Sequence, residues 1–234
     1  MQPLYEDNHL IIVHKQAGEI VQGDKTGDTP LSDIVKQYIK EAYAKPGNVF
    51  LGVVHRLDRP VSGAVVFART SKALSRLNDM FRNGEVHKTY WAIVEKPQSR
   101  SAVSPIRVGE IVTLTHWLVR NERQNKSYAY AREVPAAKKA VLDYQLIAEG
   151  DRYLLLEIHL HTGRHHQIRC QLAHVGLPIR GDLKYGARRS NPDGSISLCA
   201  RSVAFTHPVS HQPVSVVCPV PDEPLWAVLT AATH

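Results

Sequence analysis

Cysteine is scarce in this 234-residue chain, since Cys170, Cys199 and Cys218 are the only three and form no C-x-x-C pair. An odd number of dispersed cysteines argues against a disulfide framework and against a zinc site built on cysteine. No apolar run approaches the roughly 20 residues that cross a bilayer, and the first residues lack a basic segment followed by an apolar one. We therefore expect a cytoplasmic protein without a membrane segment.

Several motifs of common enzyme classes are also missing. The sequence has no P-loop, no G-x-G-x-x-G after a strand and no G-x-S-x-G elbow. Nothing in it supports a nucleotide cofactor or a serine hydrolase.

Acidic residues are fewer than basic ones, at 22 against 29, which gives a formal net charge of +7. This excess favours a polyanionic partner, and nucleic acid before a membrane surface. A hydrophobic content of 43% is that of an ordinary globular protein.

The apolar pattern predicts more strands than helices and no regular alternation of the two. Strands are expected at residues 10–13, 63–68, 89–94, 141–147, 153–160, 203–205 and 214–217. Helices are expected from 30 to 45 with Thr29 as N-cap, from 71 to 83 after Thr70 or Ser71, from 162 to 176 and around 225–229. We therefore expect an α+β fold, with one domain over residues 1–234 on a largely antiparallel mixed sheet flanked by helices and loops.

A single carboxylate, Asp58, lies among His55, Arg56 and Arg59 and just before Pro60. A basic stretch that only held phosphate would be weakened by an acid in its middle. Asp58 is therefore either half of a structural ion pair or a group that takes part in chemistry, and this stretch alone does not decide between the two.

Two residues further along the chain are candidates for the same site. Arg169 is expected at the edge of the buried stripe of its helix, where a cation needs an anionic partner, and Asp58 is the candidate. An arginine partner would keep Asp58 ionised, as a nucleophilic carboxylate requires. Tyr90 lies on a strand with one face free to line a cleft. Taken singly, Tyr90 is more often a core aromatic and Arg169 more often a structural clamp.

Four histidines, at 161, 165, 166 and 174, suggest a metal site by their spacing. The neighbouring Arg164 and Arg169 would repel a cation, and further converging ligands are missing from the pattern. We expect no metal.

The segment from Arg120 to Lys139 carries six basic residues against two acids, with Tyr128 and Tyr130 between them. The mixture is typical of a phosphate-contacting hairpin or flexible loop. A solvated surface loop is the other interpretation.

Six short motifs are spread over nearly the whole chain. They are Tyr5-Glu6-Asp7-Asn8-His9-Leu10, His55-Arg56-Leu57-Asp58 with Ser62-Gly63, Lys88-Thr89-Tyr90, Thr162-Gly163-Arg164-His165-His166-Gln167-Ile168-Arg169, Pro178-Ile179-Arg180-Gly181-Asp182 with Tyr185-Gly186, and Thr206-His207-Pro208. In this order they resemble one enzyme family, the RluA-type RNA pseudouridine synthases.

The resemblance implies a catalytic domain with its active-site cleft across the sheet, and neither metal nor organic cofactor. It implies Asp58 as the catalytic aspartate, Arg169 as its ion-pair partner and Tyr90 as an active-site tyrosine that packs on the target base. It also implies that Arg56 enters the RNA stack in place of the target uridine. The candidate substrate-binding residues are His55, Arg56, Arg59, Arg164, His165 and Gln167.

Some positions depart from the pattern of the family. Gln16 follows Lys15 where proline is usual, Gln171 replaces a common histidine, and Cys199 replaces another. The small RNA-binding domain that precedes some relatives is not expected here.

The sequence therefore predicts an enzyme that isomerises uridines in structured RNA, ribosomal or transfer, to pseudouridine after base flipping. RNA is the expected partner, with no obligate protein partner, and the chain is expected to be a monomer. Two alternatives stay open: a nucleic-acid glycosylase, which would admit water and release the base, and a non-catalytic RNA-binding module.

Overall fold

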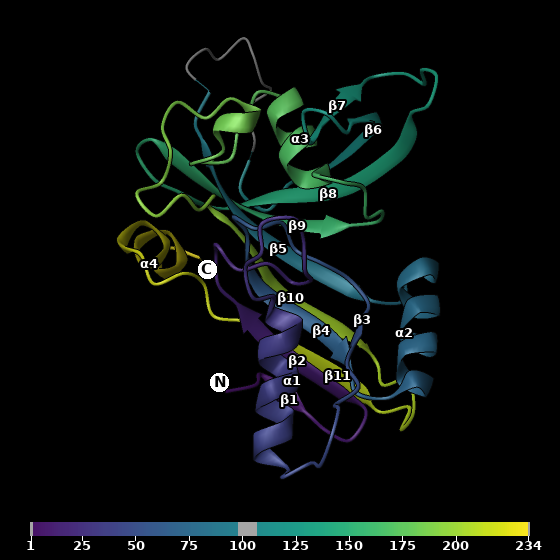
Figure 1. Cartoon of the computed structure of the whole chain (residues 1–234). Helices are drawn as coiled ribbons and strands as arrows, with labels where there is room; N and C mark the ends of the chain where they lie inside the picture. Colours follow the sequence, from purple (N-terminus) through teal and green to yellow (C-terminus); the bar gives the residue numbers. More distant parts are fainter. Residues whose placement is uncertain (1, 98–106, 234) are drawn as a thin grey trace. The chain divides into compact units, whose positions relative to one another are not determined.

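The computed structural model describes residues 2–97 and 107–233 (Figure 1). Contacts between Cα atoms divide the chain into two compact units. Unit 1 comprises Met1–Lys88 and Ala200–Val220, and unit 2 comprises Thr89–Cys199 and Pro221–His234. The expectation of one catalytic domain over residues 1–234 stays a prediction.

Unit 1 is built on a sheet whose strands follow the order β1-β2-β4-β10, with β3 also paired to β4 and β11 to β10. The strands are β1 (Tyr5–Glu6), β2 (Leu10–Lys15), β3 (Gly52–Val53), β4 (Ser62–Ala68), β10 (Leu198–Thr206) and β11 (Pro213–Val217). β2 is antiparallel to β1 and to β4, and β10 is antiparallel to β11. Every residue of β4 is buried, because this strand has neighbours on both edges and packed layers on both faces.

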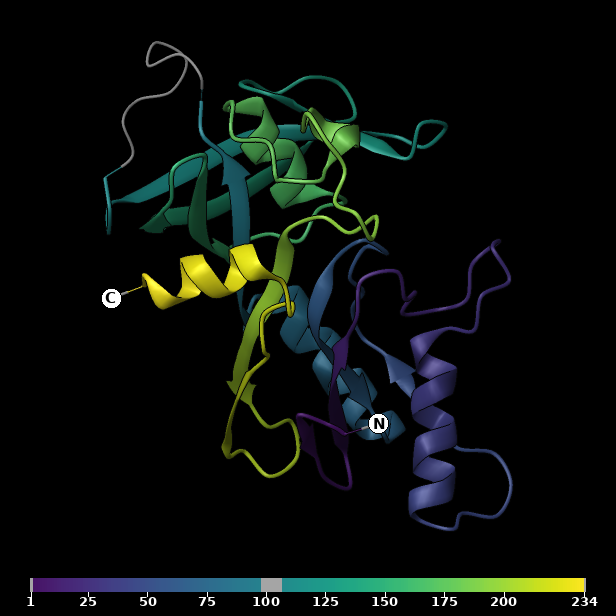
Figure 2. The ribbon, with the colours of Figure 1, turned by 90° about the vertical axis from the view of Figure 1, so that its left-hand side faces the viewer.

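Two helices flank the sheet of unit 1, α1 (Leu31–Ala42) and α2 (Ser71–Asn83). Ala73, Leu77 and Met80 of α2 join Leu10 and Val66 of the strands in one buried apolar cluster. Tyr38 of α1 donates a hydrogen bond to Glu6 of β1, with 3.0 Å between the oxygens, and Figure 2 shows α1 beside this part of the sheet. The sheet therefore has a helix-covered core, as the apolar spacing of both segments predicts.

The ends of these helices test the predicted caps. Thr70 is the N-cap of α2 and accepts a hydrogen bond from the Ala73 N–H at 3.2 Å, and Gly84 ends the helix in the left-handed region, so this prediction is confirmed. The prediction of Thr29 as N-cap of α1 is wrong. Pro30 holds that position with extended backbone and without a side-chain hydrogen bond, and the Leu31 and Ser32 N–H groups bond instead to the carbonyls of residues 20 and 21.

Unit 2 is built on a second antiparallel set of strands in the order β5-β9-β8-β6-β7. They are β5 (His87–Glu95), β6 (Ile111–Asn121), β7 (Lys126–Tyr130), β8 (Lys138–Glu149) and β9 (Tyr153–Leu160). The two predicted strands on either side of Gly150 are confirmed. The basic segment from 120 to 139 begins at the end of β6 and contains β7 and the start of β8. Its hairpin interpretation is therefore confirmed for residues 120–130, while the expected phosphate contact stays a prediction.

The helices of unit 2 are α3 (Gln167–His174), the 3-10 turn η1 (Leu183–Tyr185) and α4 (Pro224–Ala231). α3 packs on the strands through Cys170, which shares an apolar cluster with Leu118, Ala140 and Tyr185. Its predicted start near residue 162 is wrong, because residues 162–166 form a turn and His166 takes the left-handed conformation at φ 52°.

Both units confirm the predicted α+β class with a largely antiparallel sheet, while the cleft expected across it stays a prediction. Within residues 2–97 and 107–233, no helix has the length and apolar character needed to cross a membrane.

Candidate functional site

Asp58 lies on the loop that joins β3 to β4 in unit 1. The carbonyl of Asp58 accepts a hydrogen bond from the Val61 N–H at 3.0 Å, which closes a tight turn through Arg59 and Pro60. The Asp58 side chain is half-buried. Gly63, just after the turn, has φ 128°, and a side chain there would collide with the Ala200 backbone. Glycine at this position therefore lets β4 begin within a few residues of Asp58 and lie close against the Ala200 backbone.

A buried cation, Lys15, donates hydrogen bonds to the backbone of this loop. Lys15, at the end of β2, is fully buried, and its Nζ donates to the carbonyls of Gln16 at 3.0 Å, Arg59 at 3.1 Å and Val61 at 2.6 Å. Burial lowers the pKa of Lys15 to about 8, against the opposing attraction of Glu19 and Asp58. Lys15 thus fixes backbone on the C-terminal side of Asp58 and lies within electrostatic reach of its carboxylate. Sequence reasoning missed this role, because the three acceptors are backbone carbonyls that the sequence pattern does not mark.

The predicted substrate-binding residues of this loop have different surroundings. Arg59 forms ion pairs with Asp28 at 2.6 Å and Asp24 at 3.6 Å, so it ties the Asp58 loop to the Gly-rich loop before α1. His55 is stacked on Phe81, with 4.9 Å between ring centroids. Arg56 is exposed to solvent.

His55 also has a defined hydrogen-bonding role. Its Nε2 accepts the Val66 N–H at 2.9 Å, which requires the neutral ring. Burial, with a smaller contribution from the Lys88 charge, lowers the pKa of His55 to about 3. His55 therefore supports β4 as a neutral acceptor, and its assignment to substrate binding stays a prediction.

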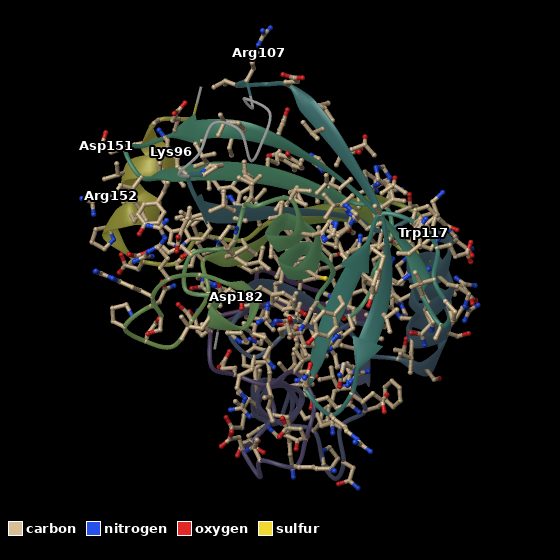
Figure 3. All side chains as sticks on the ribbon, turned by 90° about the horizontal axis from the view of Figure 1, so that it is seen from above. Lys96, Arg107, Trp117, Asp151, Arg152 and Asp182 are labelled. Carbon is tan, nitrogen blue, oxygen red and sulfur yellow. The ribbon has the colours of Figure 1, made fainter. Side chains whose placement is uncertain are left out.

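Arg169 of unit 2 is buried and forms a two-pronged ion pair with Asp182. The Arg169 Nε lies 2.6 Å from Oδ2 of Asp182, and its Nη2 lies 2.9 Å from Oδ1. Only 6% and 1% of the two side chains are exposed, so both charges depend on the pair for their solvation. The Asp182 partner was missed from the sequence, and the pairing of Arg169 with Asp58 stays a prediction. Figure 3 labels Asp182 on the turn that precedes η1.

Tyr185 extends this buried polar cluster. The Arg169 guanidinium lies 5.1 Å from the centroid of its ring, and its hydroxyl lies 2.9 Å from Nδ1 of His166. The same hydroxyl accepts the Ser127 N–H at 2.8 Å, which connects the β6–β7 hairpin to η1. Burial raises the pKa of Tyr185, so the phenol stays neutral. The sequence motif around Tyr185 does not indicate this structural role.

Tyr90 is buried on β5, where it pairs in register with Ile158 of β9. β5 is the first strand in the order of unit 2, and its antiparallel pairing with β9 fixes the Tyr90 backbone. Its role at the target base stays a prediction.

The turn before α3 holds the remaining candidates. The Gln167 side chain accepts the Arg164 N–H at 2.9 Å and the Thr162 hydroxyl at 2.7 Å, so it organises the turn from inside. Arg164 is exposed and its Nε donates to the Lys139 carbonyl at 3.0 Å. His165 is held by Ser127 at 2.9 Å and Asn125 at 3.1 Å. The three residues therefore belong to one turn, in which Gln167 has a structural task.

The histidines singled out for metal binding have separate neighbours. His161 lies 2.6 Å from Asp143, His165 and His166 are stacked on each other, and His174 contacts His116 edge to face. Across the described ranges, no group of three or more His, Cys, Asp or Glu side chains is placed to hold a metal ion.

Comparison with known proteins gives consistent results. The family model described as RNA pseudouridylate synthase matches residues 9–174. The tRNA pseudouridine synthase C of Salmonella typhi is 32% identical over 98% of this chain and 89% of its own length. The ribosomal large subunit pseudouridine synthase D of Xylella fastidiosa is 32% identical over 94% of this chain, which spans 66% of that relative.

A solved structure of Human RNA Pseudouridylate Synthase Domain Containing 4 superposes with a TM-score of 0.74 at 22% identity, covering 94% of this chain and 88% of its own. At that identity the likeness bears on the fold alone. The matched family model and the relatives above 30% identity are evidence of common ancestry, and so of family membership. Together with the motifs around Asp58 and Arg169, they show that the chain belongs to the RNA pseudouridylate synthase family.

Proposed function

We propose that this chain is an RNA pseudouridine synthase with Asp58 as its catalytic carboxylate. The observation that carries the proposal is the support of the Asp58 loop by the buried Lys15 cation, in a chain of this family. A carboxylate on a backbone fixed on its C-terminal side is preorganised, which is what a reacting group needs.

The reaction is an isomerisation in which nothing is oxidised or added. The bond from N1 of uracil to C1′ of ribose breaks, the base turns, and C5 bonds to C1′. The proton on C5 is released and N1 gains one, so atoms and charge balance. A carboxylate can assist as nucleophile or as base in these steps.

Tyr90 and Arg169 are the proposed partners of Asp58. Tyr90 would pack on the target base after the base has been flipped out of its stack, a step that costs a few kcal/mol. Arg169, oriented by Asp182, would hold Asp58 ionised. Arg56, exposed on the same loop as Asp58, would fill the stack that the uridine leaves.

Ribosomal or transfer RNA is the proposed substrate class, because relatives named for each match most of this chain. We expect the chain to act as a monomer in the cytoplasm, where both RNAs are found.

Substitution of Asp58 by asparagine tests the proposal. Asp58→Asn keeps the shape of the side chain but removes the charge, so we expect RNA affinity and melting temperature near wild type and no isomerisation. The assay is tritium release from transfer and ribosomal RNA labelled at uridine C5. Asp79→Asn is a matched control, since Asp79 is an exposed acid of α2 paired only with its neighbour Arg82 among the described residues.

Substantial tritium release by Asp58→Asn would refute the assignment of the catalytic residue. Free uracil in the reaction, with abasic RNA, would instead identify a glycosylase. RNA binding without any tritium release by the wild type would leave the non-catalytic module as the better description.

A further inference from the structure

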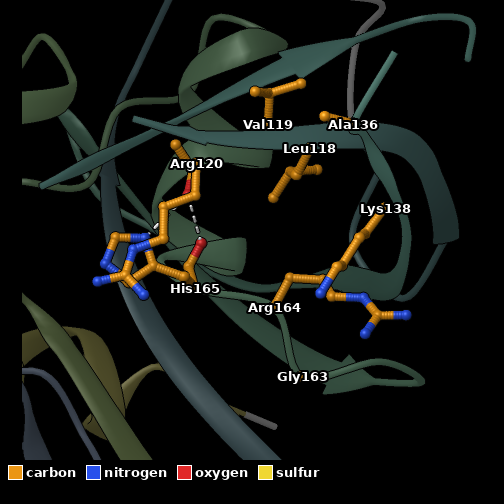
Figure 4. A pocket seen from close by; sticks show the side chains of 9 residues that line it. Leu118, Val119, Arg120, Ala136, Lys138, Gly163, Arg164 and His165 are labelled. Atoms are coloured by element: carbon orange, nitrogen blue, oxygen red, sulfur yellow. Dashed lines mark hydrogen bonds between the residues drawn. The ribbon is translucent and has the colours of Figure 1, made fainter. Parts of the chain in front are cut away.

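Unit 2 contains a pocket of about 330 Å³ between the sheet and the turn before α3 (Figure 4). Its size is at the lower end of ligand pockets, which measure roughly 300–1,000 Å³. The lining residues are Leu118, Val119, Arg120, Ser127, Ala136, Lys138, Gly163, Arg164 and His165.

Strand register explains why charged side chains reach this pocket. Leu118 pairs with Lys138 across β6 and β8, and side chains of one strand alternate between its two faces. Arg120 therefore shares a face with the buried Leu118, and Lys138 shares it with the buried Ala140. This is the face on which Cys170 of α3 packs, so both cations project beside the helix end.

Arg164 reaches the pocket from the opposite wall. The Gln167 side chain fixes its backbone, and its Nε donates to the Lys139 carbonyl, which holds one edge of the guanidinium against β8. In Figure 4, Arg164 and Lys138 are drawn on one side of the pocket, and Arg120 and His165 on the other.

The lining thus has three permanent cations and no carboxylate. Like charges at one pocket repel each other. An anion in the pocket would relieve that repulsion. Guanidinium groups bind phosphate through paired hydrogen bonds, and lysine adds a point charge.

Building on the proposed function, we infer that this pocket binds a backbone phosphate of the RNA substrate. The subsite positions the strand and takes no part in bond making or breaking. Within the basic 120–139 segment, the proposal assigns phosphate binding to the two cations that line the pocket, Arg120 and Lys138. Arg164 joins them from outside the segment.

The test compares two double variants with the same loss of charge. Arg120→Ala/Lys138→Ala removes two cations of the pocket. Arg132→Ala/Lys139→Ala is the matched control, because Arg132 and Lys139 are exposed, come from the same segment and do not line the pocket. The probe is an unmodified transfer RNA transcript, and its Kd is measured at several salt concentrations between 50 and 200 mM.

A plot of the logarithm of the binding constant against the logarithm of the salt concentration has a negative slope. Loss of one phosphate contact makes this slope less steep by roughly 0.7–0.9. We expect this change in the pocket variant and a slope within error of wild type in the control. Between 50 and 200 mM salt, the Kd of the pocket variant should therefore rise by a factor roughly threefold smaller than the Kd of the wild type does. Coincident slopes for wild type and pocket variant would overturn the inference, and so would equal changes in both double variants.

Inorganic phosphate, added at constant ionic strength, distinguishes a phosphodiester site from a site for the free ion. We expect no displacement of RNA at low millimolar phosphate. Displacement from the wild type but not from the pocket variant would reassign the pocket to free phosphate and overturn the inference.

Tritium release by the same wild-type preparation separates this inference from the proposed function. Release of tritium by the wild type, with the same salt slope in wild type and pocket variant, would refute the phosphate subsite and support the proposed function. Altered slopes without any release would remove the function and leave a phosphate subsite of an RNA-binding protein.

Discussion

Arg169 and Asp182 form a deeply buried ion pair in unit 2, and their two hydrogen bonds match the planar fork of arginine to a carboxylate. Such a pair adds little net stability over apolar residues of the same shape. Removing Arg169 is different, because it takes from the buried Asp182 carboxylate the two hydrogen bonds that it accepts from this guanidinium.

We predict that Arg169→Ala lowers the free energy of unfolding by about 3–5 kcal/mol, the range for a broken buried pair. Asp182→Ala should also lower the free energy of unfolding, and the double variant should lose clearly less than the sum of the two single losses. Urea denaturation of the four proteins gives the coupling energy. Additive losses would mean that the two side chains do not depend on each other.

The residue scale also shows what the sequence can and cannot indicate. Arg169 was predicted to need an anionic partner, from its place beside an apolar stripe. Its partner Asp182 was not predicted, because a contact across 13 residues depends on how the turn after α3 folds back. Lys15 was missed for the same reason, since its three acceptors are backbone carbonyls that carry no sequence signature.

At the scale of elements, α2 offers a clean test of local sequence signals. Its N-cap is Thr70, whose hydroxyl accepts the Ala73 N–H. We predict that Thr70→Ala lowers the free energy of unfolding by about 1 kcal/mol, while Thr70→Ser stays within a few tenths of wild type. Thermal or urea denaturation measures both. Equal losses in the two variants would show that the Thr70 methyl group, and not the cap, supports the helix.

Elements with such local signals were predicted well, and elements without them were not. α2 has both a capping threonine and a terminal glycine. The turn before α3 is held by the side chain of Gln167, which is itself the first residue of the helix. Because no residue before Gln167 marks this turn, the sequence pattern of residues 162–169 resembled the start of a helix. β6 was hidden because its polar residues alternate with buried ones only over part of its length.

At the scale of the whole molecule, acid stability should depend on His55. Its ordinary pKa of 6.5 falls to about 3 in the folded chain, so the unfolded state binds the extra proton between these values. Stability is therefore fully present above pH 6.5 and declines as the pH falls toward 3. The contribution amounts to about 1.4 kcal/mol per pH unit within the window.

We predict that His55→Gln, whose amide oxygen can accept the Val66 N–H, flattens this decline. Between pH 7 and pH 5 the wild type should lose roughly 2 kcal/mol more than the variant. Urea denaturation at a series of pH values measures the difference. Parallel pH profiles for the two proteins would indicate that His55 titrates normally in the fold.

The division of unit 1 between two distant stretches of chain has a consequence for synthesis on the ribosome. β4 has its neighbour β10 only after the segment beginning at Ala200 has been made. At about 5–20 residues per second, the intervening segment of 111 residues, from Thr89 to Cys199, delays that neighbour by roughly 5–20 s. During this interval β4 presents an open edge of apolar residues, the kind of surface that recruits other chains. Nascent unit 1 is therefore expected to need protection until translation has passed Val217, whereas unit 2 has all five of its strands by Leu160.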